Sequence, residues 1–155
     1  MKASKRISLV AISLLMLAFS FRAFAVLGGD ESSIAADMTQ MKATVKVTPN
    51  DAFAVHEIKA AGGPTVREYV SAAGRVFGVA WQGPSVPDLQ QLLGPYFQQY
   101  SAAAQAAKAG HPGRKPLNIE LPGLVVQNSG HMRSFYGRAY DPSLLPQGVS
   151  ADAVR

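Results

Sequence analysis

The sequence predicts an α+β fold: an antiparallel β-meander with a helix packed on one face and a C-terminal β-hairpin, preceded by a short N-terminal helix. Segments rich in β-branched and aromatic residues follow one another between residues 53 and 82, separated by glycine-containing turns, and predict the meander. Apolar residues recur at three- and four-residue spacing between residues 89 and 100, as on one face of a helix. Strand-like segments after residue 117 predict the hairpin.

Residues 1–25 have the organisation of a secretory signal peptide. Basic residues near the start precede an apolar run over residues 7–21, and Ala23 and Ala25 occupy the small-residue positions of an A-x-A cleavage site. A membrane-spanning helix needs about 20 apolar residues, and this run is shorter. We therefore expect cleavage after Ala25, a location in the periplasm or outside the cell, and contact with a membrane only through the signal peptide before cleavage.

Charge and cysteine content exclude several classes of protein. The chain has 15 Lys and Arg residues against 10 Asp and Glu, but four of the basic residues lie in the signal peptide, which has no acid. The rest is therefore close to neutral, which excludes a domain that binds nucleic acid mainly through phosphate charge. The absence of cysteine excludes disulfides, thiolate zinc sites and a cysteine nucleophile.

The N-terminal half of the mature chain predicts a short helix and then four strands. A helix is expected over about 32–40, and strict alternation over 41–48 predicts a half-buried strand. Strands over 53–59, 65–70 and 75–82 complete the meander. Gly74 is expected in the left-handed region, at the end of a type I turn in a bulged hairpin.

Two predictions concern how the meander strands pair. One hairpin register sets Glu57 against Glu68, which is unfavourable, and the other sets Glu57 against Arg67, which contributes roughly 0.2–1 kcal/mol. We favour the second. Strand alternation then places Phe77, Val79 and Trp81 on one face, beside Arg67 and Tyr69 of the neighbouring strand.

The C-terminal half predicts a helix and three more strands. Ser85 is expected as the N-cap of the helix, with Asp88 at N3, and Pro95 predicts a kink or break because it lacks an N–H. Strands are expected over 117–121, 124–128 and 132–140, with Ser129 and Gly130 in the last turn. We expect a single α+β domain over 26–140 and an irregular C-terminal tail over 141–155.

Several short segments of the sequence form a distinctive set: residues 66–70 (VREYV), 74–84 (GRVFGVAWQGP), 87–89 (PDL), 92–97 (LLGPYF), 27–29 (LGG), 130–132 (GHM) and 137–139 (GRA). With these segments the sequence resembles a family of small exported proteins of Gram-negative bacteria, catalogued as domain of unknown function 2844. The resemblance implies export and a single small domain. It implies no activity and no catalytic residue.

The residues themselves predict no catalytic, cofactor or metal site. The three histidines, His56, His111 and His131, form no metal-ligand motif, and the serines form no G-x-S-x-G elbow. His56 and Glu57 are adjacent on a strand, so their side chains point to opposite faces. We expect a non-enzymatic protein.

The candidate binding surface comprises Arg67, Tyr69, Phe77 and Trp81. The simpler interpretation is that the aromatic side chains form a core face covered by another element, and the alternative is a partly open surface that binds a partner. The predicted function is a periplasmic or secreted binding or accessory module, with a small ligand or an envelope protein as its partner. The alternative is a structural component of an envelope assembly, and a small enzyme is less favoured.

Overall fold

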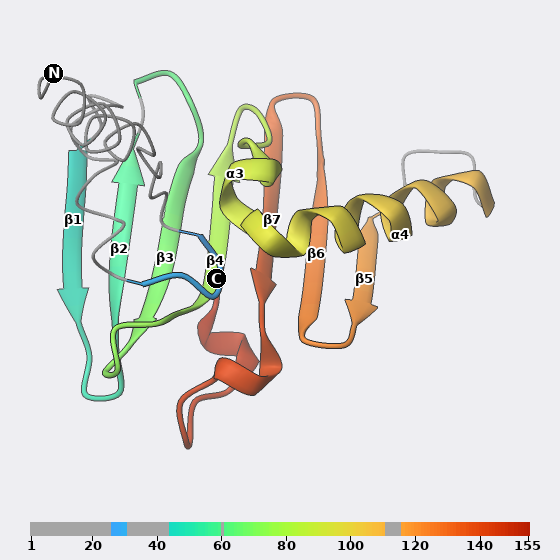
Figure 1. Ribbon diagram of the computed structural model, residues 1–155. Helices are drawn as coiled ribbons and strands as arrows, with labels where there is room; N and C mark the ends of the chain where they lie inside the picture. Colours follow the sequence, from blue (N-terminus) through green and yellow to red (C-terminus); the bar gives the residue numbers. More distant parts are fainter. Residues whose placement is uncertain (1–25, 31–43, 60, 111–115) are drawn as a thin grey trace, which may run out of the picture.

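The computed structural model describes residues 26–30, 44–59, 61–110 and 116–155, and an antiparallel sheet forms its centre. Figure 1 shows its seven strands side by side, in the order β1-β2-β3-β4-β7-β6-β5. They are β1 Thr44–Pro49, β2 Phe53–Lys59, β3 Thr65–Ser71, β4 Val76–Gly83, β5 Leu117–Leu121, β6 Leu124–His131 and β7 Ser134–Tyr140. This arrangement confirms the predicted meander and C-terminal hairpin. The predicted N-terminal helix over 32–40 lies outside the described residues.

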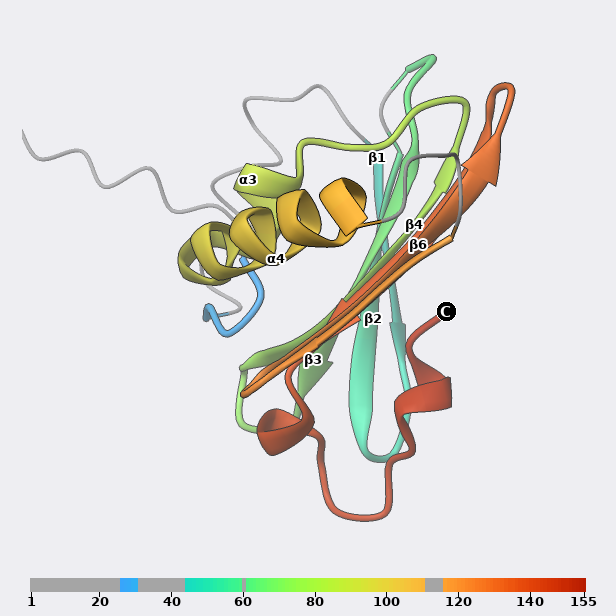
Figure 2. The ribbon, with the colours of Figure 1, turned by 90° about the vertical axis from the view of Figure 1, so that its right-hand side faces the viewer.

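One face of the sheet, here called the helix-covered face, packs against the helical segment, as Figure 2 shows. The segment consists of α3 (Leu89–Leu93), the 3-10 turn η2 (Gly94–Tyr96) and α4 (Phe97–Gly110). The break at η2 confirms the effect predicted for Pro95. Ser85 is not the N-cap: the Asp88 side chain accepts hydrogen bonds from the backbone N–H groups of Gln90 and Gln91.

The main hydrophobic core lies between this face and the helices. Leu92, Leu93 and Tyr100 from the helical segment pack over Val79 and Trp81 of β4 and over further apolar side chains of β6 and β7. Ala139 of β7 faces the helices, whereas the small residues of β4, Gly78 and Ala80, face the C-terminal segment on the other side of the sheet. The predicted packing of a helix on one sheet face is therefore confirmed.

The opposite face, here called the groove face, has a second, smaller core under residues 141–155. This C-terminal segment contains two 3-10 turns, η3 (Pro142–Leu144) and η4 (Ala151–Ala153), and crosses the sheet on the side away from the helices (Figure 2). Val154 is fully buried, and its methyl groups would lie 2.7 Å from a Cβ added at Gly78. The expected irregular tail is thus a covering layer. The other members of this core are Tyr69, Phe77, Ala80, Phe53, Val55, Tyr140, Leu144, Leu145 and Val149.

The first described residues are fixed in the main core. Leu27 is fully buried, and its N–H donates to the backbone oxygen of Leu92 at 3.0 Å. The Gly28 N–H donates to the oxygen of Val76 at 2.8 Å, which ties the segment to the start of β4. Folded structure therefore extends to the position that follows the predicted cleavage site.

A β-bulge in β4 overturns the predicted face assignment. Gly74 has φ +73°, as predicted for the β3–β4 turn. Beyond it, Val70 pairs with Val76 but Tyr69 pairs with Gly78, so Phe77 is the extra residue. An extra residue reverses the alternation of the side chains that follow it. Phe77 therefore lies with Tyr69 in the groove-face core, whereas Val79 and Trp81 lie in the main core.

The turn of the C-terminal hairpin also differs from the prediction. Met132 and Arg133 form it, with φ values of 42° and 69°, whereas Ser129 and Gly130 belong to β6. A two-residue hairpin turn with both central φ values positive matches the twist of the flanking strands. The glycine at position 130 serves a close approach, because a Cβ there would lie 2.3 Å from the Ser134 backbone oxygen.

Candidate functional site

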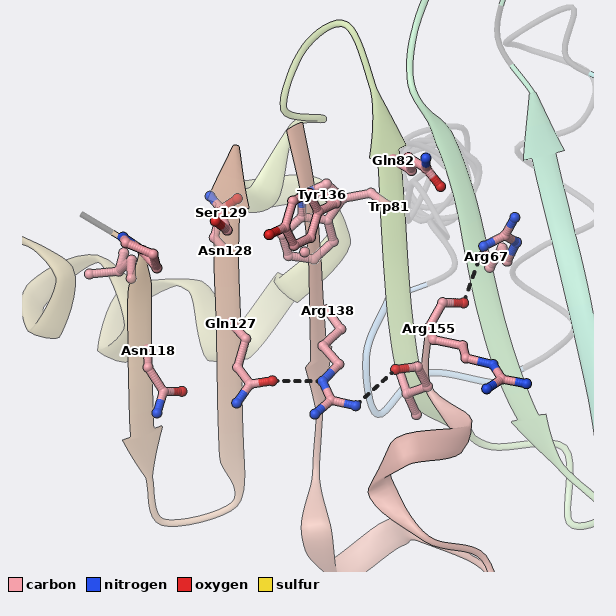
Figure 3. A pocket seen from close by; sticks show the side chains of 14 residues that line it. Arg67, Trp81, Gln82, Asn118, Gln127, Asn128, Ser129, Tyr136, Arg138 and Arg155 are labelled. Atoms are coloured by element: carbon pink, nitrogen blue, oxygen red, sulfur yellow. Dashed lines mark hydrogen bonds between the residues drawn. The ribbon is translucent and has the colours of Figure 1, made fainter. Parts of the chain in front are cut away.

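A groove of about 600 Å³, lined by both polar and apolar groups, crosses the part of the groove face that the C-terminal segment leaves open (Figure 3). Cross-strand pairing aligns its floor: Asn118 of β5 lies opposite Gln127 of β6, and Gln127 lies opposite Arg138 of β7. Arg138 is followed across β4 by Ala80 and across β3 by Arg67. Ala80 is buried in one core with Val154, and the C-terminal segment lies between the two guanidinium groups, accepting hydrogen bonds from both.

A second row of side chains runs parallel to the first. Ser129 of β6 lies opposite Tyr136 of β7, and Tyr136 lies opposite Gln82 of β4. Tyr136 is 57 % exposed and belongs to neither core of the described residues. An exposed aromatic ring among amide and hydroxyl groups gives the groove both an apolar surface and hydrogen-bonding groups.

The C-terminal segment forms one wall of the groove, and Arg138 holds this wall in place. Its Nε donates to Oε1 of Gln127 at 2.7 Å, and its Nη1 donates to the backbone oxygens of Ala151 and Val154 at 3.1 and 3.2 Å. The same Nη1 lies 3.5 Å from Oδ1 of Asp152. One guanidinium thus holds the C-terminal segment against the sheet while it orients an amide of the floor (Figure 3).

Arg67 and Tyr69 hold the end of that wall. The backbone N–H of Arg155 donates to the Tyr69 hydroxyl at 2.9 Å, and the hydroxyl donates to the backbone oxygen of Arg155. Nη1 of Arg67 donates to the same oxygen at 3.2 Å. These contacts leave the Arg155 side chain exposed along the groove (Figure 3).

The predicted register between β2 and β3 is confirmed. Glu57 pairs with Arg67, and Nε of Arg67 donates to Oε2 of Glu57 at 2.9 Å. Lys59 Nζ lies 2.9 Å from the other oxygen, Oε1. Hydrogen bonds from Lys59 and then Arg67 lower the pKa of Glu57, so this carboxylate stays ionised and neutralises part of the positive charge beside the groove.

Trp81 and Gly137 support the floor of the groove from the helix-covered side of the sheet. Trp81 is 3 % exposed and lies in the main core, and its ring covers Gly137 so closely that a Cβ there would lie 2.4 Å from Cζ2. Among the described residues, the indole Nε1–H has no hydrogen-bond partner. Trp81 therefore supports the groove as a core residue.

The structure divides the four predicted surface residues into two pairs. Arg67 and Trp81 line the groove, whereas Tyr69 and Phe77 are buried under the C-terminal segment. Sequence reasoning missed Gln127, Tyr136 and Arg138. Alternation along residues 124–140 places these side chains on one face, but only the order of β4, β7 and β6 shows that this face continues the one carrying Arg67.

The two histidines that the structure describes, His56 and His131, are not brought together. His56 is buried on the helix-covered face, where it pairs across the strands with Glu68, and His131 lies at the exposed end of β6. His111 lies outside the described residues. Within those residues, no group of three or more histidine or acidic side chains is arranged to hold a metal ion.

Comparison with known proteins places the whole domain in one family. The family model described as a protein of unknown function (DUF2844) matches residues 23–154. The chain belongs to the domain of unknown function 2844 family. No curated protein and no solved structure matches the chain. The match includes both the buried Leu27 and the C-terminal segment that forms the groove wall, so these parts belong to the family's domain.

The described part of this family member contains no helix that is both long and apolar enough to cross a membrane.

Proposed function

We propose that this protein is an exported, non-catalytic binding module that holds its ligand in the groove. The observation that carries the proposal is the meeting, on one open sheet face, of an exposed aromatic ring, several amide groups and guanidinium groups. Ligand sites combine apolar surface with a few placed polar groups in this way. The rigid sheet holds the floor, and hydrogen bonds from Arg138 and Arg67 hold the wall.

Export is supported by the meeting of two features near residue 25. The sequence has a signal-peptide pattern that ends at Ala25. The described fold has Leu27 buried and hydrogen-bonded to the helical segment. Removal of residues 1–25 would leave each of these contacts in place.

A binding function is tested with ¹⁵N-labelled protein purified from the periplasm after expression with its own leader. Fractionated soluble material from the envelope of the source bacterium is added, and the side-chain amide signals of Asn118 and Gln127 are followed. We expect one fraction to shift these signals, and we expect the shifts to be lost in Tyr136→Ala. Arg133→Gln, which changes an exposed residue outside the groove, is the matched control. Unchanged groove signals with every fraction would contradict the proposal.

The alternative, a structural component of an envelope assembly, is supported by the tip of the β6–β7 hairpin. Met132 is 84 % exposed there and is flanked by the exposed His131 and Arg133. An exposed Met between basic side chains suits contact with a partner protein. Shifts confined to Met132 and Arg133 in the same titration would favour this alternative.

A further inference from the structure

We infer that the ligand of the groove is an acidic saccharide chain that carries carboxylate groups. This inference rests on the proposed binding function and specifies its ligand class. Its basis is the chemistry and layout of the groove: planar polar groups in rows, one open aromatic ring, and one guanidinium without an acidic partner among the described residues.

The floor suits a ligand rich in hydroxyl groups. Amides of Gln82, Asn118 and Gln127 each offer a donor and an acceptor, as does the hydroxyl of Ser129. Neighbouring hydroxyl groups of a sugar ring need both kinds of partner at short spacing. The oxygen of Gln127 already accepts from Arg138, which directs its NH₂ group away from that bond and fixes its orientation.

Tyr136 supplies the apolar part of such a site. A sugar ring has C–H groups on its faces, and an exposed aromatic ring is the side chain that packs against them. Tyr136 is more than half exposed and stands between Ser129 and Gln82 in the second row. A ligand stacked on Tyr136 would therefore reach the amide and hydroxyl groups on both sides.

The shape of the groove favours a chain over a single small molecule. Its lining residues come from β5, β6, β7, β4 and β3, which are consecutive strands of the sheet. Strand spacing of about 4.8 Å makes this a span of roughly 19 Å. A bound peptide would instead use a free strand edge, and the central strands β6, β7 and β4 are paired on both sides.

The charges favour an acidic ligand. The fourteen described residues that line the groove include three arginines and no Asp or Glu side chain. Arg67 shares Glu57 with Lys59, and Arg138 has Asp152 at 3.5 Å. Within the described residues, Arg155 forms hydrogen bonds through its backbone N–H and oxygen, and its guanidinium forms no hydrogen bond or ion pair. It is available for a bidentate interaction with a carboxylate.

Glu120 places a negative charge beside the β5 end of the groove. Its Oε1 accepts from Nδ2 of Asn118 at 3.1 Å, so the β5 end carries an acidic neighbour. The β3 end carries Arg155 and Arg67. A carboxylated sugar unit is therefore expected at the β3 end, with the rest of the chain running over Tyr136 toward β5.

Titration calorimetry with oligogalacturonate, and with its carboxyl-reduced, neutral counterpart, tests this inference on the periplasmic protein. We expect the acidic oligosaccharide to bind at least tenfold more tightly than the neutral one. Tyr136→Ala should weaken binding of the acidic oligosaccharide at least tenfold. Arg155→Gln should remove most of the preference for it, and Arg133→Gln, which removes an equal charge outside the groove, should change neither affinity.

Three results would overturn the inference. The first is equal affinity for the acidic and neutral oligosaccharides, the second is binding that survives Tyr136→Ala, and the third is binding of neither probe. The envelope-fraction titration separates these failures from failure of the proposed function. If groove signals shift with an envelope fraction while neither oligosaccharide binds, the groove binds a ligand of another class and only the saccharide inference is lost.

Discussion

The bulge at Phe77 determines whether the Trp81 side chain lies in the core or at the surface. The bulge at Phe77 turns the indole toward the helices, where it is buried beside Leu93 and Tyr100. On the other side of the sheet, the exposed Tyr136 occupies the neighbouring row. The removal of the two rings is therefore expected to change stability by different amounts, although Tyr136 is the chain neighbour of Gly137, which pairs with Trp81.

Trp81→Ala is expected to lower the free energy of unfolding by about 3–5 kcal/mol, because it leaves a cavity beneath the helical segment. The matched change Tyr136→Ala is expected to cost less than about 1 kcal/mol, since that ring is mainly exposed. Urea unfolding followed by circular dichroism measures both. A Trp81→Ala variant as stable as the Tyr136→Ala variant would contradict the placement of Trp81 in the core.

At the scale of elements, polar contacts attach the C-terminal segment to the domain at its start, at η4 and at Arg155, and the first two of these anchors can be tested separately. Asp141 begins the segment: Oδ1 accepts from the Ser143 backbone N–H and hydroxyl at 2.8 and 2.6 Å, and Oδ2 accepts from the Tyr96 hydroxyl at 2.7 Å. Arg138 holds η4 through the backbone oxygens of Ala151 and Val154. The first anchor joins the segment to η2 on the helix side, and the second joins it to β7.

The first anchor makes stability depend on pH at both extremes. Burial raises the pKa of Asp141, but hydrogen bonds from Ser143 and Tyr96 outweigh it, so the pKa is lowered. Ionised Asp141 therefore stabilises the fold above its ordinary pKa of about 3.9, and this contribution is lost as the pH falls through the lowered value. Burial, then the hydrogen bond to Asp141, raises the pKa of Tyr96 to about 12. The tyrosine contribution is present below about pH 10 and is lost between about pH 10 and 12.

Tyr96→Phe is expected to lower the free energy of unfolding by about 1.5–3 kcal/mol at pH 7, because a hydrogen bond to a carboxylate is lost. Urea unfolding at a series of pH values should show a steady difference from wild type between about pH 5 and 10. The difference should shrink above pH 10, where wild type alone loses the tyrosine contribution. A difference that does not change up to pH 12 would contradict the role given to the hydroxyl.

The second anchor is tested by Arg138→Gln, which removes the bonds to the backbone oxygens of Ala151 and Val154. Amide hydrogen exchange of Ala153 and Val154 should accelerate by about tenfold or more, because η4 loses its attachment. Exchange in α4, on the opposite face, should change little and serves as the internal control. Unchanged exchange in η4 would show that the apolar contacts of Val154 hold the segment without Arg138.

At the scale of the whole molecule, each face of the sheet is covered by a layer. The first described residues belong to one layer, and residues 141–155 form the other. Val26 and Leu27 enter the core under the helices, and a Cβ at Gly94 would lie 2.0 Å from Cγ1 of Val26. Residues 141–155 close the other face. Residues 26–30 and residues 141–155 thus lie on opposite sides of one sheet (Figure 2).

We expect mass spectrometry of protein from the native envelope to give an N-terminus at Val26. The reason is the A-x-A pattern at Ala23 and Ala25, which ends two residues before the buried Leu27. Full-length expression in the cytoplasm, where signal peptidase does not act, provides the control. A membrane-bound product that retains Met1 in the native host would refute the cleavage prediction.

Local patterns in the sequence were sufficient to predict most elements. Alternation predicted the strands, the spacing of leucines and aromatics predicted the helix, and Pro95 predicted its break. The β2–β3 register followed from Glu57 and Arg67, because one register places opposite charges together and the other places like charges together. The family resemblance, carried by motifs within these elements, is also confirmed.

Other features depended on contacts between residues far apart in the chain. The bulge at Phe77 has no local signal, since its position depends on how β4 fits both β3 and β7, and it decides which ring is core and which face is open. The groove needs β7 beside β4, which brings Arg138 and Tyr136 within reach of Arg67 and Gln82. Spacing along the chain determines which side of a strand a residue occupies, but only the strand order and the fold of the C-terminal segment determine which residues it meets.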